Sequence, residues 1–255
     1  MLLAVDSSYL LLVGAAFLAG TMNAIAGGGS FVTFPALVVS GVPSIIANAS
    51  STVALFPGSF ASAWAYRHDY QSFQSVSFRA MLAVSLAGGV TGALLLLLTP
   101  QRSFDRVIPW LLLVATIVFA YGPRIAPVMQ RVFRIGPAAM LCLQYIVSIY
   151  GGYFGGAVGL MMLAVWGLFG VTDVKAMSAS RVLLVGSMNG IAVVCFIIAG
   201  KVWWTQTLLM LIGGVVGGYL GARLARRLEP ERLRLAITVL NIVVTTAFFL
   251  RAYRS

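Results

Sequence analysis

Gly20-Thr-Met-Asn-Ala-Ile-Ala-Gly-Gly-Gly-Ser-Phe-Val-Thr-Phe-Pro35 interrupts an otherwise apolar part of the chain with three consecutive glycines. A similar interruption, Gly151-Gly-Tyr-Phe-Gly-Gly-Ala-Val-Gly159, lies in the second half at an offset of 129 residues. In both places a short apolar piece follows, and then a span rich in small residues. Broken apolar segments at matching places in two halves of a membrane protein point to a transport site. The two stretches therefore predict a transporter built from two repeats.

The composition is that of a protein embedded in lipid. Hydrophobic residues make up 60% of the chain, charged residues make up 9%, and the mean hydropathy is +0.99. No charge occurs between Ser7 and Tyr66, and a spanning helix needs only about 20 apolar residues. The six acidic and 17 basic residues are too few to cover a soluble protein of this size. We expect an all-α, polytopic transmembrane protein.

The net charge of +11 does not indicate binding to nucleic acid, because the basic residues lie between apolar spans and not on one face. Arginines gather at 124–134 and 223–234, where they would meet anionic lipid and fix the orientation. Cys142 and Cys195 lie inside apolar segments without Cys-x-x-Cys spacing, so we interpret them as packing residues. No metal or cofactor is expected.

The chain divides into a first transmembrane repeat at 1–122, a basic linker at 123–136 and a second repeat at 137–255. Gly88-Gly-x-x-Gly92-Ala matches Gly217-Gly-x-x-Gly221-Ala at the offset of 129, and we interpret these glycines as sites of close helix packing. The expected apolar segments are about 9–26, 31–40, 45–66, 78–98 and 107–122, then about 138–154, 158–169, 179–199, 203–222 and 235–250.

The distribution of basic residues favours inverted repeats. If each repeat crosses the membrane an odd number of times, ten arginines lie on one side and five basic residues on the other. A parallel arrangement gives eight against seven. The positive-inside rule then places the 124–134 and 223–234 clusters in the cytoplasm and both termini outside.

The second segment of each repeat has only about 10–12 residues, half of a full span. Such a piece, entered through glycines, is typical of a broken or re-entrant helix. Backbone released from a helix at membrane depth must be buried in protein or line a wet cavity. We predict that the breaks at 27–29 and 155–159 lie near the bilayer midplane and face one another. The alternative is that their glycines only let helices pack closely.

A half-helix that begins at membrane depth presents unpaired N–H groups and the positive end of its dipole. Two such starts would bind an anion without a charged side chain, because glycines let a ligand approach the backbone. Ser30 is the expected N-cap, and it could fill that role with no ligand present. The candidate residues are Gly27, Gly28, Gly29 and Ser30 in the first break, with Gly155 and Gly156 in the second.

Arg181 is the strongest single candidate, because it begins a span that is otherwise free of charge to Ala199. A guanidinium within the membrane suits bidentate binding of an oxyanion. Its alternative role is to reach the interface from near the start of the segment. Lys175 and Asp173 are expected at the interface.

Amides and hydroxyls inside spans form a second group of candidates. Each can donate to an oxyanion, but polar side chains also join helices in membranes. For His68-Asp69, beside Arg67, a solvated loop is favoured over a proton relay. The candidates in this group are Asn23, Asn48, Ser51, Ser180 and Asn189.

The motifs resemble those of the sulfite exporter TauE/SafE family. In the first half they are Asn23-x-x-x-Gly27-Gly-Gly-Ser30, Pro35-Ala-Leu, Gly-Val-Pro43 and Ala47-Asn48, and in the second half Tyr150-Gly-Gly-Tyr-Phe-Gly155 and Lys175-Ala-Met-Ser-Ala-Ser-Arg181. The resemblance implies a membrane transporter of small anions, with sulfite, sulfonates and other organosulfur compounds as the substrate types. One departure is Gly156-Ala-Val-Gly-Leu160, where the family commonly has three glycines.

We therefore expect a secondary transporter that moves sulfite, an organosulfonate or a related sulfur or carboxylate anion across a bacterial inner membrane, through a midplane site between the repeats. A passive anion channel is the first alternative and an intramembrane enzyme the second. A single histidine at a span end and the lack of Gly-x-Ser-x-Gly argue against an enzyme. The sequence has no Gly-x-x-x-x-Gly-Lys-Ser/Thr motif for binding a nucleotide. Transport would then be driven by an ion gradient, and protons are a candidate for the coupled ion. The expected partners are the anion and the lipid bilayer, and a homodimer stays open.

Overall fold

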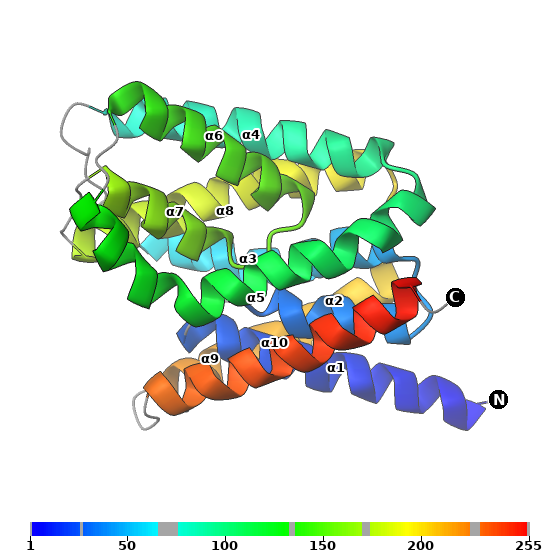
Figure 1. Cartoon of the computed structure of the whole chain (residues 1–255). Helices are drawn as coiled ribbons and strands as arrows, with labels where there is room; N and C mark the ends of the chain where they lie inside the picture. Colours follow the sequence, from blue (N-terminus) through cyan, green and yellow to red (C-terminus); the bar gives the residue numbers. More distant parts are fainter. Residues whose placement is uncertain are drawn as a thin grey trace. The chain divides into compact units, whose positions relative to one another are not determined.

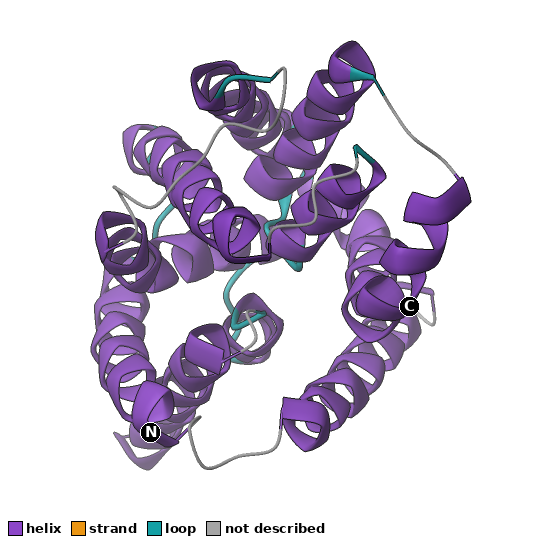
Figure 2. Cartoon of the chain, turned by 90° about the vertical axis from the view of Figure 1, so that its left-hand side faces the viewer, coloured by secondary structure: helices purple, strands orange, loops and turns teal. Residues whose placement is uncertain are grey.

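The computed structural model describes residues 2–25, 28–65, 76–132, 136–169, 174–224 and 230–253. Every regular element in these ranges is an α-helix (Figures 1 and 2), which confirms the expected all-α class. The helices are α1 Leu2–Ile25, α2 Ser30–Val39, α3 Ser44–Ala65, α4 Phe78–Leu98, α5 Gln101–Val132, α6 Pro137–Tyr153, α7 Val158–Leu168, α8 Val174–Ile198, α9 Trp204–Leu224 and α10 Pro230–Tyr253.

Three helices in the described part of the chain are long and apolar enough to cross a membrane: Phe78–Leu98, Gln101–Tyr121 and Ser180–Ile198. At a rise of about 1.5 Å per residue, a helix of about 20 residues matches the hydrocarbon core of roughly 30 Å. Large apolar side chains also stay uncovered. Leu98 is 79% exposed and Ile198 is 82% exposed, and lipid is the environment in which such exposure has no cost.

The short helices expected after the glycine breaks are present. Helix α2 has 10 residues and α7 has 11, so each is about 15–17 Å long, near half of the hydrocarbon core. Each is the second helix of its half of the sequence. The inverted relation of the two halves remains a prediction.

The chain forms two compact units, and each contains helices from both halves of the sequence. One unit comprises Met1–Gly58, Thr99–Thr116 and Phe196–Ser255, and the other comprises Ser59–Leu98 and Ile117–Cys195. We call them the first and second units. They are defined by contacts, so the division into sequence repeats stays a prediction.

In the first unit α1 runs parallel to α9, and small residues hold the two backbones together. The Thr21 hydroxyl donates to the Gly217 carbonyl at 3.0 Å. A Cβ on Gly20 would overlap the Gly214 carbonyl, and one on Gly217 would overlap the Phe17 carbonyl. Only glycine fits such a backbone approach.

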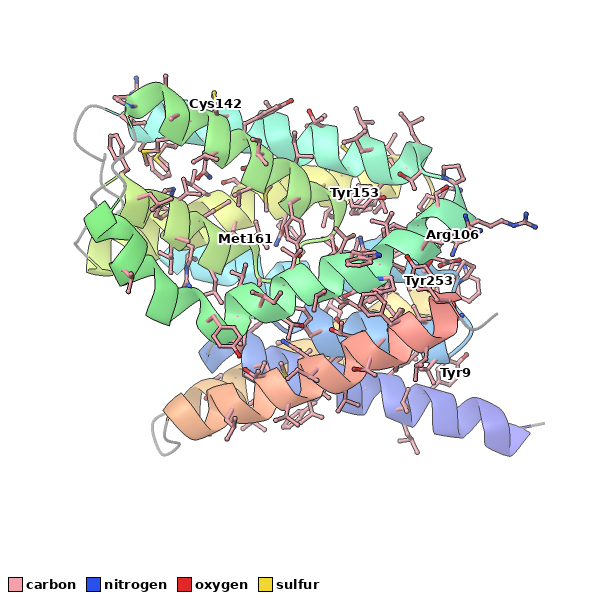
Figure 3. The ribbon with its side chains drawn as sticks, in the orientation of Figure 1. Tyr9, Arg106, Cys142, Tyr153, Met161 and Tyr253 are labelled. Atoms are coloured by element: carbon pink, nitrogen blue, oxygen red, sulfur yellow. The ribbon has the colours of Figure 1, made fainter. Side chains whose placement is uncertain are left out.

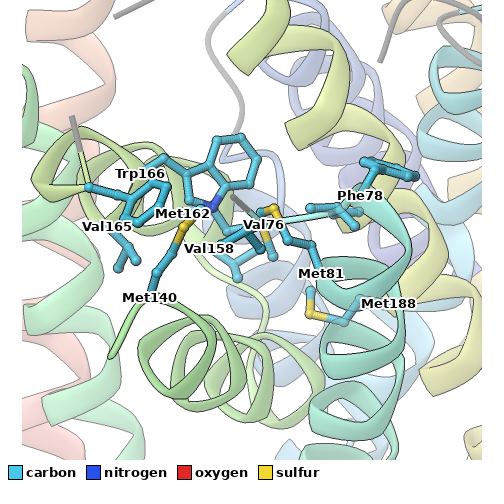
Figure 4. Close-up of a cluster of buried hydrophobic side chains, with 11 residues drawn as sticks. Val76, Phe78, Met81, Met140, Val158, Met162, Val165, Trp166 and Met188 are labelled. Atoms are coloured by element: carbon cyan, nitrogen blue, oxygen red, sulfur yellow. The ribbon is translucent and has the colours of Figure 1, made fainter. Parts of the chain in front are cut away.

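In the second unit α4 runs parallel to α6 with the same kind of contact. A Cβ on Gly88 would lie 2.6 Å from the Ser148 Cβ and 2.8 Å from the Tyr145 carbonyl oxygen. The expected packing role is therefore confirmed for Gly88 and Gly217. An apolar cluster beside these helices includes Met81, Met140, Met162, Trp166 and Met188 (Figure 4).

The start of α5 packs antiparallel to α10 in the first unit. The Trp110 indole N–H donates to the Tyr253 hydroxyl at 3.0 Å, and further along α5 the Thr116 and Thr245 hydroxyls lie 3.2 Å apart. Residue numbers therefore rise along one helix as they fall along the other. Helix α10 also contacts α2, where the rings of Phe34 and Phe248 stack with centroids 5.4 Å apart.

Candidate functional site

The first break lies between α1 and α2, in the first unit. Gly28 has φ +90°, a backbone conformation that favours glycine. The next residue, Gly29, has no room for a side chain, because a Cβ there would lie 2.6 Å from the Ala19 carbonyl oxygen and 2.9 Å from the Asn23 amide. The glycines are thus required by the way the chain turns back against the end of α1.

Asn23 holds this turn. Its Oδ1 accepts a hydrogen bond of 2.7 Å from the Gly29 N–H, so the side chain at the end of α1 binds a backbone donor at the start of α2. The expectation that Ser30 is the N-cap is wrong, because Gly29 occupies that position and Ser30 is the first residue of the helix. The physical reason is that backbone does the capping: the Phe31 N–H, which an N-cap side chain would usually accept, donates to the Gly28 carbonyl at 3.0 Å, and Asn23 accepts from the N–H of Gly29 itself.

Ser51 of α3 is joined to the same turn through Thr33. The Thr33 and Ser51 hydroxyls lie 2.6 Å apart, and the Thr33 hydroxyl also donates to the Gly29 carbonyl at 3.2 Å. Ser51 and Asn48 are buried on α3. The structure therefore brings Asn23, Gly29 and Ser51 together in one polar region, and it adds Thr33, which the sequence did not single out.

The second break lies between α6 and α7, in the second unit. Gly155 has φ +82°, and Ala157 has φ +57°, which is unusual for a residue with a Cβ. Ala157 is the N-cap of α7, and no side chain there caps the helix. Ala157 lies 129 positions after Gly28, so positions paired by the sequence offset both have left-handed backbone.

Arg181 lies across the start of α7. A Cβ added to Gly159, in the first turn of α7, would lie 3.2 Å from Cδ of Arg181, 3.5 Å from Cγ and 3.8 Å from Nε. The aliphatic part of the arginine thus rests closely on Gly159, and a Cβ at this position would have to displace it by a few tenths of an ångström. Arg181 is partly exposed, whereas the neighbouring Ser180 is buried.

Arg181 lies inside helix α8 and near the start of its apolar span, Ser180–Ile198. Helix α8 begins at Val174, so Arg181 lies about two turns inside the helix. Its guanidinium arm runs beside the N-terminal turn of α7, where backbone N–H groups and the helix dipole favour an anion. A partly exposed cation next to an uncapped helix start can bind an oxyanion through both kinds of donor.

A second polar cluster, missed by the sequence analysis, fixes α7 in place. Gln144 of α6 is fully buried, donates through Nε2 to the Ser85 hydroxyl at 2.9 Å, and accepts at Oε1 from the Trp166 indole N–H at 2.9 Å. One side chain thereby links α4, α6 and α7. Because both ends of the amide are satisfied, the cluster positions the short helix without an unpaired polar atom.

Of the two other described candidates, Gly156 lies in the second break and Asn189 lies on α8. Gly156 is buried, and Asn189 is partly buried on α8, eight residues beyond Arg181. In the described ranges no group of three His, Cys, Asp or Glu side chains is placed to hold a metal ion. Gly27, His68, Asp69 and Asp173 lie outside the described residues, as does the side chain of Lys175. The expectation that the two breaks face one another stays a prediction.

Comparison with known proteins agrees with the motifs. The family model for the sulfite exporter TauE/SafE matches residues 12–248. A probable membrane transporter protein, ORF9, from a Sinorhizobium species is 30% identical over 90% of this chain and 88% of its own length. The probable membrane transporter protein YfcA of Escherichia coli K12 is 28% identical over 90% of this chain and 85% of its own length. No solved structure matches the chain.

Proposed function

Since the chain belongs to the sulfite exporter TauE/SafE family of membrane transporters, we propose that it is a secondary carrier of a small sulfur oxyanion or organic sulfonate. The proposal places it as a multi-pass protein of a bacterial inner membrane. Short carboxylates belong to the same chemical class and are the next candidates. Substrate crosses by alternating access, with the two breaks as the half-sites.

The observation that carries the proposal is the position of Arg181 over Gly159. A cation inside a helix of the membrane region is costly unless it has a role. Here its side chain follows the first turn of α7, which no side chain caps and which is entered through the left-handed Ala157. Guanidinium and backbone N–H groups together suit the oxygens of a sulfite or sulfonate group.

The first break supplies a neutral half-site. Its donors are hydroxyls and amides around Gly29, and Thr52 occupies the position 129 residues before Arg181. One charged and one neutral half-site fit a singly charged headgroup, because a second cation within the membrane would raise the cost of the empty carrier. The asymmetry also leaves room at the neutral side for an organic substituent.

The antiparallel packing of α5 against α10 supports inverted repeats. These helices correspond at the offset of 129 residues, and equivalent helices that run in opposite directions are expected when the repeats have opposite orientation in the membrane. With inverted repeats, an exchange of conformations between the two repeats turns the site from one side of the membrane to the other.

A ligand screen followed by counterflow tests the proposal. The purified protein is heated with sulfite, thiosulfate, taurine, methanesulfonate, acetate or chloride, and a true substrate raises the midpoint of unfolding by mass action. In proteoliposomes loaded with unlabelled substrate, a carrier accumulates labelled substrate transiently against its gradient. Stabilisation by chloride alone, or flux without counterflow, would replace the carrier with a channel.

A further inference from the structure

A cationic cavity lies in the first unit, and none of its lining residues belongs to either break. It has a volume of about 360 Å³ and is lined by Arg102 and Arg106 of α5, Arg251 of α10, Asp105 and apolar side chains that include Val38 and Phe248. Because α5 begins where the antiparallel α10 ends, the three arginines meet at one end of the helix pair. Arg106 and Tyr253 mark this end in Figure 3.

The single carboxylate of the cavity is already engaged. The Ser44 hydroxyl donates to Asp105 Oδ1, and the Gln101 amide donates to the Ser44 hydroxyl at 2.5 Å and to Asp105 Oδ1 at 3.3 Å. These bonds tie the start of α3 to the first turns of α5. Among the described residues that line the cavity, three guanidinium groups and one hydrogen-bonded carboxylate give an excess of two positive charges.

An apolar groove lies on the same helix pair as the cationic cavity. Its volume is about 350 Å³, and its lining consists of Trp110, Phe249, Leu250 and Tyr253. A hydrogen bond links the two linings, because the Tyr253 hydroxyl of the groove donates to the carbonyl of Arg106 at 3.3 Å. Trp and Tyr side chains are typical of the zone where lipid headgroups meet acyl chains.

We propose that this end of the α5–α10 pair binds an anionic phospholipid. The phosphate group lies among Arg102, Arg106 and Arg251, and the start of an acyl chain lies along the Trp110–Tyr253 groove. The positive charge of the cavity favours an anionic headgroup. The apolar groove on the same helix pair suits an acyl chain, which free phosphate and sulfite lack. The site shares no residue with either break, and Val38 in its lining belongs to α2, the short helix after the first break.

Native mass spectrometry of the purified full-length protein tests the proposal. Phosphatidylglycerol, phosphatidylcholine and inorganic phosphate are titrated separately, and the fraction of protein with bound ligand is measured. The expected result is selective retention of phosphatidylglycerol. Arg102→Gln with Arg106→Gln should weaken that retention roughly fivefold per arginine.

Two matched controls make the result specific. Arg79→Gln on α4 with Lys201→Gln between α8 and α9 removes two exposed cations that do not line the cavity and should leave phosphatidylglycerol binding unchanged. Leu250→Ala should weaken the lipid without changing the charge, whereas Leu208→Ala, on an exposed part of α9, should not. All variants are checked for an unchanged melting temperature in detergent alone.

Three outcomes would overturn the lipid site. The first is equal binding of phosphatidylglycerol and phosphatidylcholine. The second is full retention of phosphatidylglycerol by the Arg102→Gln, Arg106→Gln variant. The third is that inorganic phosphate binds as tightly as phosphatidylglycerol and is lost in the same variant, which would make the cavity a site for free anions.

Discussion

The hydroxyls of Thr116 and Thr245 lie 3.2 Å apart, and these two residues are separated by the same 129 positions that align the two halves of the sequence. Each is thus bonded to its own counterpart. A contact between equivalent residues lies on the axis that relates them. Because α5 and α10 are antiparallel here, that axis crosses the helices and does not run along them, as the predicted inversion of the repeats requires.

We expect the threonine pair to be coupled in stability. Thr116→Val and Thr245→Val should each lower the free energy of unfolding by about 0.5–1 kcal/mol, the range measured for polar contacts between helices in membranes. The double variant should lose less than the sum, because the second substitution breaks a bond that is already gone. Unfolding of all four proteins in SDS provides the cycle, and strict additivity would remove the contact from the account.

Ala157 and Gly28 both have left-handed backbone, so exchanging alanine and glycine at the two positions should change stability in opposite directions. Ala157→Gly should raise the free energy of unfolding by up to about 1 kcal/mol, since it removes the penalty that a Cβ incurs in this conformation. Gly28→Ala should lower it by at least about 1 kcal/mol for the same reason. Thermal unfolding measures both, and a stabilising Gly28→Ala would contradict the assigned backbone.

Gln144 should contribute strongly to the free energy of unfolding, although its side chain carries no charge. Gln144→Leu leaves the Trp166 N–H without its acceptor and the Ser85 hydroxyl without its donor, so we expect a loss of about 2–4 kcal/mol from two unsatisfied buried groups. Trp166→Phe removes one of the two bonds and is the graded control. If Gln144→Leu were neutral in chemical unfolding, the cluster would not hold α7.

The topology prediction is decided by accessibility labelling. In a background lacking Cys142 and Cys195, single cysteines at 124–134 and at 223–234 should react from the cytoplasmic side. A cysteine at Lys201 should react from the outside. The inverted arrangement fails if the two arginine clusters label from opposite sides.

The sequence located the helices well where glycine and charge mark their ends. The expected segments at 31–40, 78–98 and 158–169 correspond to Ser30–Val39, Phe78–Leu98 and Val158–Leu168. Helix α5 instead runs from Gln101 to Val132, through Pro123 and Pro127, beyond the expected 107–122. The apolar composition predicts only the part of a helix that is suited to lipid. The backbone hydrogen bonds decide where the helix begins and ends.

How far the contacts of the site residues could be predicted depends on the sequence separation between the partners. Asn23 accepts a hydrogen bond from Gly29, only six residues away. An asparagine just before a glycine break could therefore have indicated the hydrogen bond that holds this turn. Gln144 depends on Ser85 and Trp166, 59 and 22 residues away, and no local pattern reveals that pairing. The contact of Arg181 with Gly159 was not predictable either, although the charge inside an apolar span marked the arginine itself.

Substrate affinity of Arg181 and Gly159 variants tests the central claim most directly. With the anion selected by the ligand screen, Arg181→Gln should lose about 2–3 kcal/mol of binding free energy, as expected for a charge-assisted hydrogen bond, and Arg181→Lys should lose part of it because the forked geometry is gone. Gly159→Ala should displace the arginine and weaken binding, whereas Gly14→Ala, where a Cβ meets nothing within 4 Å, should not. Titration calorimetry beside thermal unfolding separates binding from folding. Full affinity in a stable Arg181→Gln protein would contradict the account.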